Sequence, residues 1–207
     1  MKIEYDINLT ALGELMLIAA TNNGVCYLNF TKFHLSKAFV NLNNTLCSVD
    51  FDINKEVLRN ELFKSFEIWC LSKDPNVEIN VNKGNTLIVE CFNEVNRYFK
   101  LKPEEKISFK FAVQLDLLGS KFHVLVWEEM LRTLHFGNIC SYAGLAKQIG
   151  NEKAYRAVAT ANASNPIPLI VPCHRVIGKD RKLKGYGCGG IYVKEFLLTH
   201  ENQEWRN

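Results

Sequence analysis

The sequence lacks the features that mark a membrane-spanning or exported protein. It has no run of about 18 consecutive apolar residues, which is the length that a helix needs to cross a bilayer. Acidic residues interrupt the N-terminus and no long apolar core follows them, so we expect no signal peptide. Repeats and low-complexity tracts are also absent from the sequence. These absences predict a globular protein that acts without a membrane.

The sequence also lacks any Cys-x-x-Cys pair, which argues against a zinc knuckle. Cys26 and His34 remain possible ligands, so a metal in the N-terminal half stays open, but we predict no metal site and no cofactor. An odd number of cysteines without an export signal favours a reducing intracellular compartment, either a nucleus or a bacterial cytoplasm. The seven cysteines stand at positions 26, 47, 70, 91, 140, 173 and 188.

The chain of 207 residues is long enough for one large or two small domains. Its net charge of +3 is small but unevenly placed. Residues 138–185 contain eight lysines and arginines and only two acidic residues. This excess fits a surface that faces phosphates, and it fits an ordinary solvated basic face equally well.

The N-terminal half combines strand and helix patterns. Asn23-Gly24 lies between two apolar segments, which is a strong hairpin signal. Five segments have the pattern of strands, namely 2–8, 15–20, 25–30, 48–53 and 107–113. Two segments have helical spacing, with one face made by Leu58, Leu62, Phe66 and Trp69 and the other by Ile88, Cys91, Phe92, Val95 and Phe99. We therefore predict an α+β domain with an antiparallel sheet over residues 1–114.

Residues 115–207 are predicted to form a second, mostly helical domain. Ser120 can cap a helix whose apolar face holds Trp127, Met130, Leu131 and Leu134. Ser141 can cap a short helix over residues 142–149. Gly150-Asn151 then predicts a turn with a new cap, followed by a helix over residues 152–163. This outline matches a helix-turn-helix, although any helical hairpin produces it. A last helix is predicted over residues 191–200.

The segment 165–178 carries the most specific chemistry in the chain. Pro172 fixes its own φ and pushes Val171 toward an extended conformation, so we expect Cys173 on a stiff, extended segment. A free cysteine has a pKa of about 8.5 and becomes a strong nucleophile only as thiolate. The neighbouring His174 and Arg175 are the kind of groups that lower this pKa. A buried, inert cysteine remains the alternative.

These features together resemble the alkylguanine-DNA alkyltransferases, also called methylated-DNA–protein-cysteine methyltransferases. The Pro172-Cys173-His174-Arg175-Val176 core is highly specific, and the match covers most of residues 115–201. The N-terminal half matches more weakly, through Leu12-Gly13-Glu14-Leu15 and the hairpin after it. The other matching residues are Leu115-Asp116-Leu117, Gly119, Phe122, Ser141-Tyr142, Arg156-Ala157-Val158, Asn165-Pro166, Ile170-Val171, Tyr186, Gly189-Gly190 and the segment from Lys194 to Glu201. The resemblance implies an RNase H-like first domain and a helix-turn-helix second domain.

The resemblance also implies the catalytic residues. Cys173 would accept the alkyl group from O6-alkylguanine irreversibly, so each molecule would act once. His174 would take the thiol proton through a water, and Glu201 would hold His174 in the required tautomer. Asn165 would brace the turn before the cysteine. From the residues alone, a core histidine and a solvated glutamate at a helix end are the simpler interpretations.

The resemblance also implies which residues would contact the substrate base and the DNA. The target base must leave the duplex, which costs a few kcal/mol. Arg156 would fill the gap that the extruded base leaves in the duplex. Tyr142 would assist the extrusion and protonate guanine N3. The pocket would be made by Tyr186, the Gly187 amide and the carbonyls of Cys173 and Val176. The DNA backbone would be contacted by Ala143, Asn151 and Lys179.

Two positions depart from the family pattern. The loop from Tyr186 to Gly190 is one residue longer than the animal version, so either Gly187 or Cys188 is the O6 donor. Asn162 stands where some relatives have methionine. We expect a monomer that acts on double-stranded DNA carrying O6-alkylguanine. The alternatives are a non-catalytic lesion sensor or helix-turn-helix regulator and, third, a cysteine hydrolase.

Overall fold

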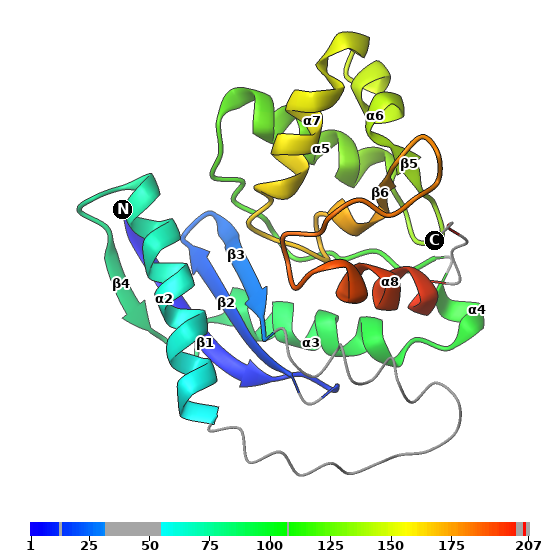
Figure 1. Ribbon diagram of the computed structural model, residues 1–207. Coiled ribbons are helices and arrows are strands. Elements are labelled where there is room, and N and C mark those ends of the chain that lie inside the picture. Colours follow the sequence, from blue (N-terminus) through cyan, green and yellow to red (C-terminus); the bar gives the residue numbers. More distant parts are fainter. Residues whose placement is uncertain (13, 32–54, 107, 202–204, 206–207) are drawn as a thin grey trace. The chain divides into compact units, whose positions relative to one another are not determined.

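The computed structural model describes residues 1–12, 14–31, 55–106, 108–201 and 205 (Figure 1). The chain divides into two compact units. The first contains residues 1–99 and 113–116, and the second contains residues 100–112 and 117–207. The predicted boundary after residue 114 differs from this division, mainly because residues 100–112 belong to the second unit. Within the described residues, no helix is long and apolar enough to span a bilayer.

The first unit contains a four-stranded sheet in the order β3-β2-β1-β4. The predicted hairpin is confirmed, since β2 (Leu15–Thr21) and β3 (Gly24–Phe30) pair antiparallel, and β1 (Lys2–Leu9) pairs antiparallel with β2. Gly24 has a φ of +147°, and a Cβ there would lie 2.7 Å from the backbone carbon of Leu115. Only glycine fits this turn without strain.

The sheet is mainly antiparallel, as predicted, and contains one parallel pair that was not predicted. β4 (Glu78–Val81) pairs parallel with β1 and was not predicted. Two of its four residues are exposed and two are half-buried, so the strand carries almost no hydrophobic pattern. The predicted strand over residues 48–53 lies outside the described residues.

Two helices of the first unit were predicted correctly. In α2 (Lys55–Lys73), Leu62 and Phe66 are buried, and Leu58 and Trp69 are half-buried. In α3 (Thr86–Lys100), the predicted residues Ile88, Cys91, Phe92 and Val95 are buried, whereas the predicted Phe99 is half-buried and Tyr98 is buried instead. These apolar faces are the pattern that the helical spacing predicts.

The predicted strand over residues 107–113 is wrong for its described part, 108–113, which contains no strand. The rings of Phe109 and Phe111 instead pack edge to face, with their centroids 5.0 Å apart. The backbone pairing lies further along the chain than predicted. The Val25 amide donates a hydrogen bond of 2.8 Å to the Gln114 carbonyl, and the Val25 carbonyl accepts one of 2.8 Å from the Asp116 amide. Apolar alternation alone therefore misplaced this pairing.

The second unit is mostly helical, as predicted, and the fold class of the chain is α+β. α5 (Lys121–Thr133) begins after Ser120, whose hydroxyl accepts a hydrogen bond of 3.2 Å from the His123 amide. The buried Trp127 of α5 donates a hydrogen bond of 2.8 Å from Nε1 to the Ala161 carbonyl and so ties α5 to the next-but-one helix. The short helix α4 (Pro103–Lys106) precedes α5.

The helix-turn-helix consists of α6 (Tyr142–Gln148) and α7 (Tyr155–Ala163). Ser141 caps α6, because its hydroxyl accepts a hydrogen bond of 3.0 Å from the Gly144 amide. Gly150 adopts a φ of +75° in the turn. The predicted single helix over residues 152–163 is divided into the 3-10 turn η2 (Glu152–Ala154) and α7. The predicted cap at Asn151 makes no side-chain hydrogen bond.

A short parallel pair places the helix-turn-helix beside the cysteine motif. β5 (Cys140–Ser141) leads directly into α6 and pairs with β6 (Val176–Ile177). β6 follows the 3-10 turn η3 (Cys173–Arg175). The last helix, α8 (Ile191–His200), is confirmed, and Glu201 is its C-cap.

Candidate active site

The segment before the cysteine is curled, which corrects the prediction of an extended segment. Asn165 is buried, its Nδ2 donates a hydrogen bond of 2.9 Å to the Val171 carbonyl, and its Oδ1 accepts one of 3.0 Å from the Ile167 amide. Leu169 adopts a φ of +76°. These two side-chain bonds close a compact turn that local proline effects did not predict, and Cys173 begins η3 directly after it. Asn165 therefore braces the turn, as expected.

The Cys173 thiol is buried and acidic. Its Sγ lies 3.9 Å from the Tyr186 hydroxyl oxygen. A hydrogen bond from Cys188 is the main cause that lowers the pKa of Cys173 to about 7, against the opposing effect of burial. Hydrogen bonds from Asn165 and Tyr186 and the charge of Lys194 lower it further. The thiolate form is therefore populated at neutral pH.

The other buried cysteines behave in the opposite way. Burial raises the pKa of Cys70 to about 12 and raises the pKa values of Cys26 and Cys91 still more. This is the expected behaviour of an inert thiol in an apolar interior. The contrast shows that the surroundings of Cys173 stabilise its thiolate, which the alternative of an inert cysteine does not explain.

His174 and Glu201 form a fully buried pair. Glu201 Oε1 lies 2.9 Å from His174 Nε2. Burial lowers the pKa of His174, against the attraction of Glu201, so the imidazole is neutral at neutral pH. Burial would raise the pKa of Glu201, but the hydrogen bonds from His174 and Arg175 and the charge of Arg175 outweigh it and hold this pKa far below its usual range. A carboxylate only accepts, so Nε2 carries the proton and donates it.

The remaining imidazole nitrogen is available for proton transfer. His174 Nδ1 is buried and has no hydrogen-bond partner among the described residues. Because Nε2 holds the proton, Nδ1 carries the lone pair and is the basic atom of the ring. The expected contact between His174 and Glu201, 27 residues apart, is present, so the interpretation of Glu201 as a solvated helix end is wrong.

Arg175 has a different role from the one that the sequence indicated. Its Nε and Nη2 donate hydrogen bonds of 2.8 Å to the two oxygens of Glu201, and Nη1 donates one of 2.6 Å to the Leu134 carbonyl. The guanidinium therefore neutralises Glu201 rather than the thiolate. The cation that acts on Cys173 is Lys194, which the sequence reading missed. Its position on the apolar face of the last helix, between Val193 and Leu197, was the available signal.

A pocket of about 380 Å³ brings together several predicted substrate residues. Tyr142, Arg156 and Gly187 line it, together with Asn162 and Lys184. Asn162 is buried and its Oδ1 has no hydrogen-bond partner among the described residues. Cys173, Val176 and Tyr186 are buried and are not among the residues that line this pocket.

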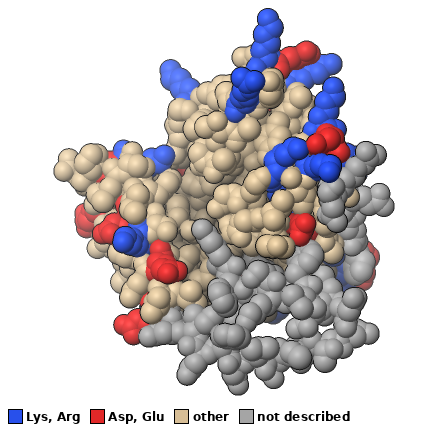
Figure 2. Space-filling view, viewed as in Figure 1, with Lys and Arg blue, Asp and Glu red and all other residues tan. Residues whose placement is uncertain are grey.

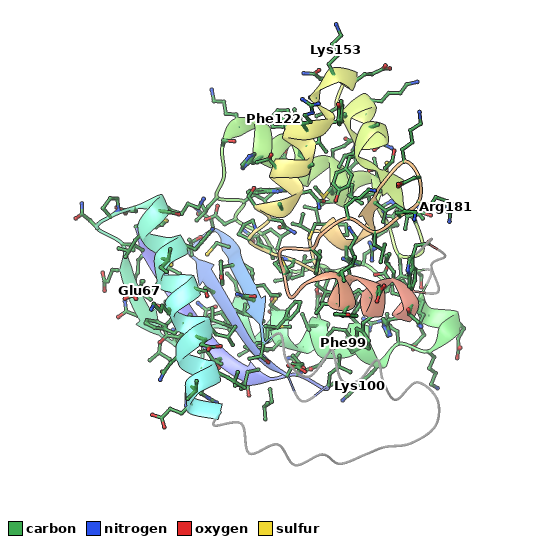
Figure 3. The ribbon with its side chains drawn as sticks, viewed as in Figure 1. Glu67, Phe99, Lys100, Phe122, Lys153 and Arg181 are labelled. Carbon is green, nitrogen blue, oxygen red and sulfur yellow. The ribbon has the colours of Figure 1, made fainter. Side chains whose placement is uncertain are left out.

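The predicted DNA-contacting residues lie on the surface of the second unit. Ala143, Asn151, Arg156 and Lys179 are exposed. Lys153 projects from the turn between α6 and α7, and Arg181 from the loop after β6 (Figure 3). Lysine and arginine side chains stand out from this part of the unit, whereas acidic side chains are fewer there (Figure 2).

The fold and the site together define a helix-turn-helix protein with an ionisable, buried cysteine beside a histidine–glutamate pair. The sequence profile of the 6-O-methylguanine DNA methyltransferase DNA binding domain matches residues 121–203. A methylated-DNA–protein-cysteine methyltransferase of Mycobacterium leprae is 42% identical over 120 residues, which are 58% of this chain and 68% of that protein. One of Methanosarcina acetivorans is 44% identical over 112 residues, 54% of this chain and 70% of that protein.

The structural comparison extends over nearly the whole chain. The crystal structure of Mycobacterium tuberculosis OGT in complex with DNA matches with a TM-score of 0.64 and 28% identity, covering 96% of this chain and 93% of that chain. The alignment with the Mycobacterium bovis relative, 48% identical, spans only 62% of that protein. The chain belongs to the methylated-DNA–protein-cysteine methyltransferase family.

Proposed function

We propose that this protein repairs DNA by transferring the alkyl group of O6-alkylguanine to its own Cys173, once per molecule. The main support is the ionisation of this thiol. The pKa of Cys173 is lowered to about 7, whereas burial raises the pKa values of Cys26, Cys70 and Cys91. A thiolate is the nucleophile that such a transfer needs.

The transfer forms one bond and breaks one. The Cys173 sulfur attacks the alkyl carbon, the carbon–O6 bond breaks, and its electron pair remains on the guanine. The product is a neutral thioether, which has no tendency to reverse. We assign to His174 Nδ1 the task of accepting the thiol proton through a water, because this atom carries the lone pair and has no other protein partner among the described residues. Glu201 keeps the imidazole in that tautomer.

The substrate base is assigned to the pocket lined by Tyr142, Arg156 and Gly187. Tyr142 has its pKa raised, first by burial and then by the Cys173 charge, so it keeps a proton to give to guanine N3. The loop amide at residue 187 or 188 donates to O6, and the Cys173 and Val176 carbonyls accept the exocyclic amine. Tyr186 closes the wall behind the base.

The DNA duplex is assigned to the helix-turn-helix. Ala143 and Asn151 lie at the start of α6 and in the turn, and Lys179 lies in the loop after β6; each is exposed, and we assign all three to contacts with the phosphate backbone. Arg156 stands exposed on α7 at the mouth of the pocket and takes the place of the extruded base. This function requires an intracellular, reducing compartment, because oxidation of Cys173 removes the nucleophile.

The test is a mass measurement on the Cys173 peptide. The protein is incubated with duplex DNA that carries one O6-methylguanine, digested and weighed. One methyl group in place of the thiol hydrogen on Cys173 is the expected result, and Cys173→Ala should bind the same DNA and leave its methyl group in place. Binding with no methyl loss, by the unaltered protein, would instead support a lesion sensor.

Arg156 provides a second test of the same proposal. Arg156→Ala should slow transfer from duplex DNA much more than transfer from single strands, because extrusion costs little in a single strand. Arg181→Ala, which alters an exposed cation away from the pocket lining, is the matched control. Equal slowing on both substrates would contradict the assigned role of Arg156.

A further inference from the structure

Lys194 is a charged side chain in an unusual position. It lies on α8 and is 0% exposed. Burial lowers its pKa to about 8, against the attraction of Cys173, so the ammonium form still predominates at pH 7. A buried ammonium normally requires a partner of opposite charge, because it has lost its hydration. The surroundings of Lys194 therefore need an anion.

The hydrogen bonds of Lys194 do not supply this anion. Its Nζ donates a hydrogen bond of 2.6 Å to the Val176 carbonyl, and within the described residues no carboxylate lies within 4.0 Å of it. The buried carboxylate of the site, Glu201, is already bound by Arg175 and His174. The hydrogen bond to the Val176 carbonyl satisfies one N–H of the Lys194 ammonium but does not balance its positive charge.

The Cys173 sulfur is the remaining candidate for the counter-charge. Both groups lie near Tyr186. Lys194 Nζ lies 5.9 Å from the centre of the Tyr186 ring, and Cys173 Sγ lies 3.9 Å from the Tyr186 hydroxyl oxygen. The attraction between the lysine and the thiolate lowers the pKa of Cys173 and opposes the fall in the pKa of Lys194. Each charge therefore stabilises the other.

The other ionisable groups around the thiol do not provide a free positive charge. Tyr142 on α6 has its pKa raised and stays neutral, and His174 in η3 has its pKa lowered by burial and stays neutral. Cys188 acts on Cys173 as a hydrogen-bond donor. Arg175 is neutralised by Glu201.

We propose that Lys194 is a positioning residue for alkyl transfer, whose ammonium stabilises the Cys173 thiolate and holds the Val176 carbonyl in place. This inference rests on the proposed function and extends it, since the Val176 carbonyl is also the assigned acceptor of the guanine amine. A carbonyl oxygen has two lone pairs, so it can accept from both groups. Lys194 thus connects the nucleophile to the recognition of the base.

The proposal is tested by the pH dependence of Cys173 reactivity. Iodoacetamide alkylation of Cys173 is followed from pH 5 to 10 by the mass of the peptide that contains it. Proteolytic cleavage between Cys173 and Cys188 places the two cysteines in separate peptides, so their alkylation is measured separately. Lys194→Met should move the midpoint upward by about one pH unit, so that alkylation at pH 7 is about fivefold slower, while the rates converge above pH 9. Lys194→Arg should restore most of the shift, and Lys121→Met, at an exposed position of the same unit, should cause none.

The result that overturns the proposal is an unchanged midpoint in Lys194→Met, with a rate lowered equally at every pH. Such a pattern indicates damage to the structure rather than loss of the charge. Urea unfolding of each variant shows whether it is folded before its profile is compared.

A second measurement needs no variant. Unaltered protein with 13C-labelled lysine is titrated by NMR before and after Cys173 is alkylated with iodoacetamide. Loss of the thiolate charge should lower the pKa of Lys194 by about one unit, because the coupling between two sites is reciprocal. An unmoved lysine titration would overturn the proposal. Both measurements use iodoacetamide alone, so failure of methyl transfer from DNA would contradict the proposed function without deciding the role of Lys194.

Discussion

Replacement of Glu201 by glutamine should destabilise the second unit severely. Glu201 is 2% exposed, and its carboxylate accepts hydrogen bonds of 2.9 Å from His174 and of 2.8 Å twice from Arg175. Glutamine offers one oxygen and one NH₂ group, so at least one donor of the histidine or arginine would face another donor. The Arg175 guanidinium would also remain buried without a negative charge beside it, because its bond to the Leu134 carbonyl is to a neutral group.

The expected loss follows from these contacts. Removal of one member of a buried ion pair costs about 3–5 kcal/mol, because the other charge stays buried and unpaired. Glu128→Gln is the control, since Glu128 is exposed on α5 and should change stability by less than about 0.5 kcal/mol. Urea unfolding is followed by the fluorescence of the buried Trp127, with Trp69 and Trp205 replaced by phenylalanine in every protein.

Two further results bear on the same reasoning. Arg175→Met combined with Glu201→Gln should recover part of the loss, because no buried charge is then left without a partner. The pKa of Glu201 lies below its ordinary value of 4.5, so its contribution is complete above pH 4.5 and is lost as the pH falls through the folded-state pKa. A loss below about 1 kcal/mol at pH 7, similar to that of the Glu128 control, would refute the argument.

Three other substitutions give smaller and separable effects. Cys188→Ala should raise the pKa of Cys173 from about 7 toward its usual value, because the largest stabilising hydrogen bond is lost, and iodoacetamide alkylation at pH 7 should slow while that at pH 10 should not. Asn165→Ala leaves the buried Ile167 amide without its side-chain acceptor and removes one of the two hydrogen bonds that the Val171 carbonyl accepts, so it should cost about 1–3 kcal/mol in urea unfolding, and a neutral result would contradict the bracing role. Ser141→Ala removes the cap of α6 and should cost about 1 kcal/mol, with alkylation of Cys173 unchanged.

Several elements were predictable because their signals are local. The hairpin at Asn23-Gly24 follows from a turn that only glycine fits, and the apolar faces of α2 and α3 follow from helical spacing. The caps at Ser120 and Ser141 lie next to the helices that they begin. Each of these features involves residues that are only a few positions apart, so their spacing in the sequence is enough to predict the local structure.

The elements that were predicted wrongly depend instead on contacts with residues that their own local sequence pattern does not identify. β4 has four residues and exists because β1 offers it an edge, and the pairing at Leu115 depends on Val25, far away in the chain. The extended segment expected before Cys173 was inferred from proline alone, whereas the bonds of Asn165 curl it. In each case a partner that no local pattern identifies decided the backbone conformation.

The sequence by itself determined the nucleophile, its neighbouring histidine and the family to which the chain is similar, because the Pro172–Val176 core is contiguous. Only the tertiary structure decided how the charges are distributed. It assigns Arg175 to Glu201, 26 residues away, and places Lys194 against the Val176 carbonyl, 18 residues away. The physical reason is that burial makes the electrostatic energy of a charge depend on which group lies beside it, and the folded path of the chain selects that neighbour.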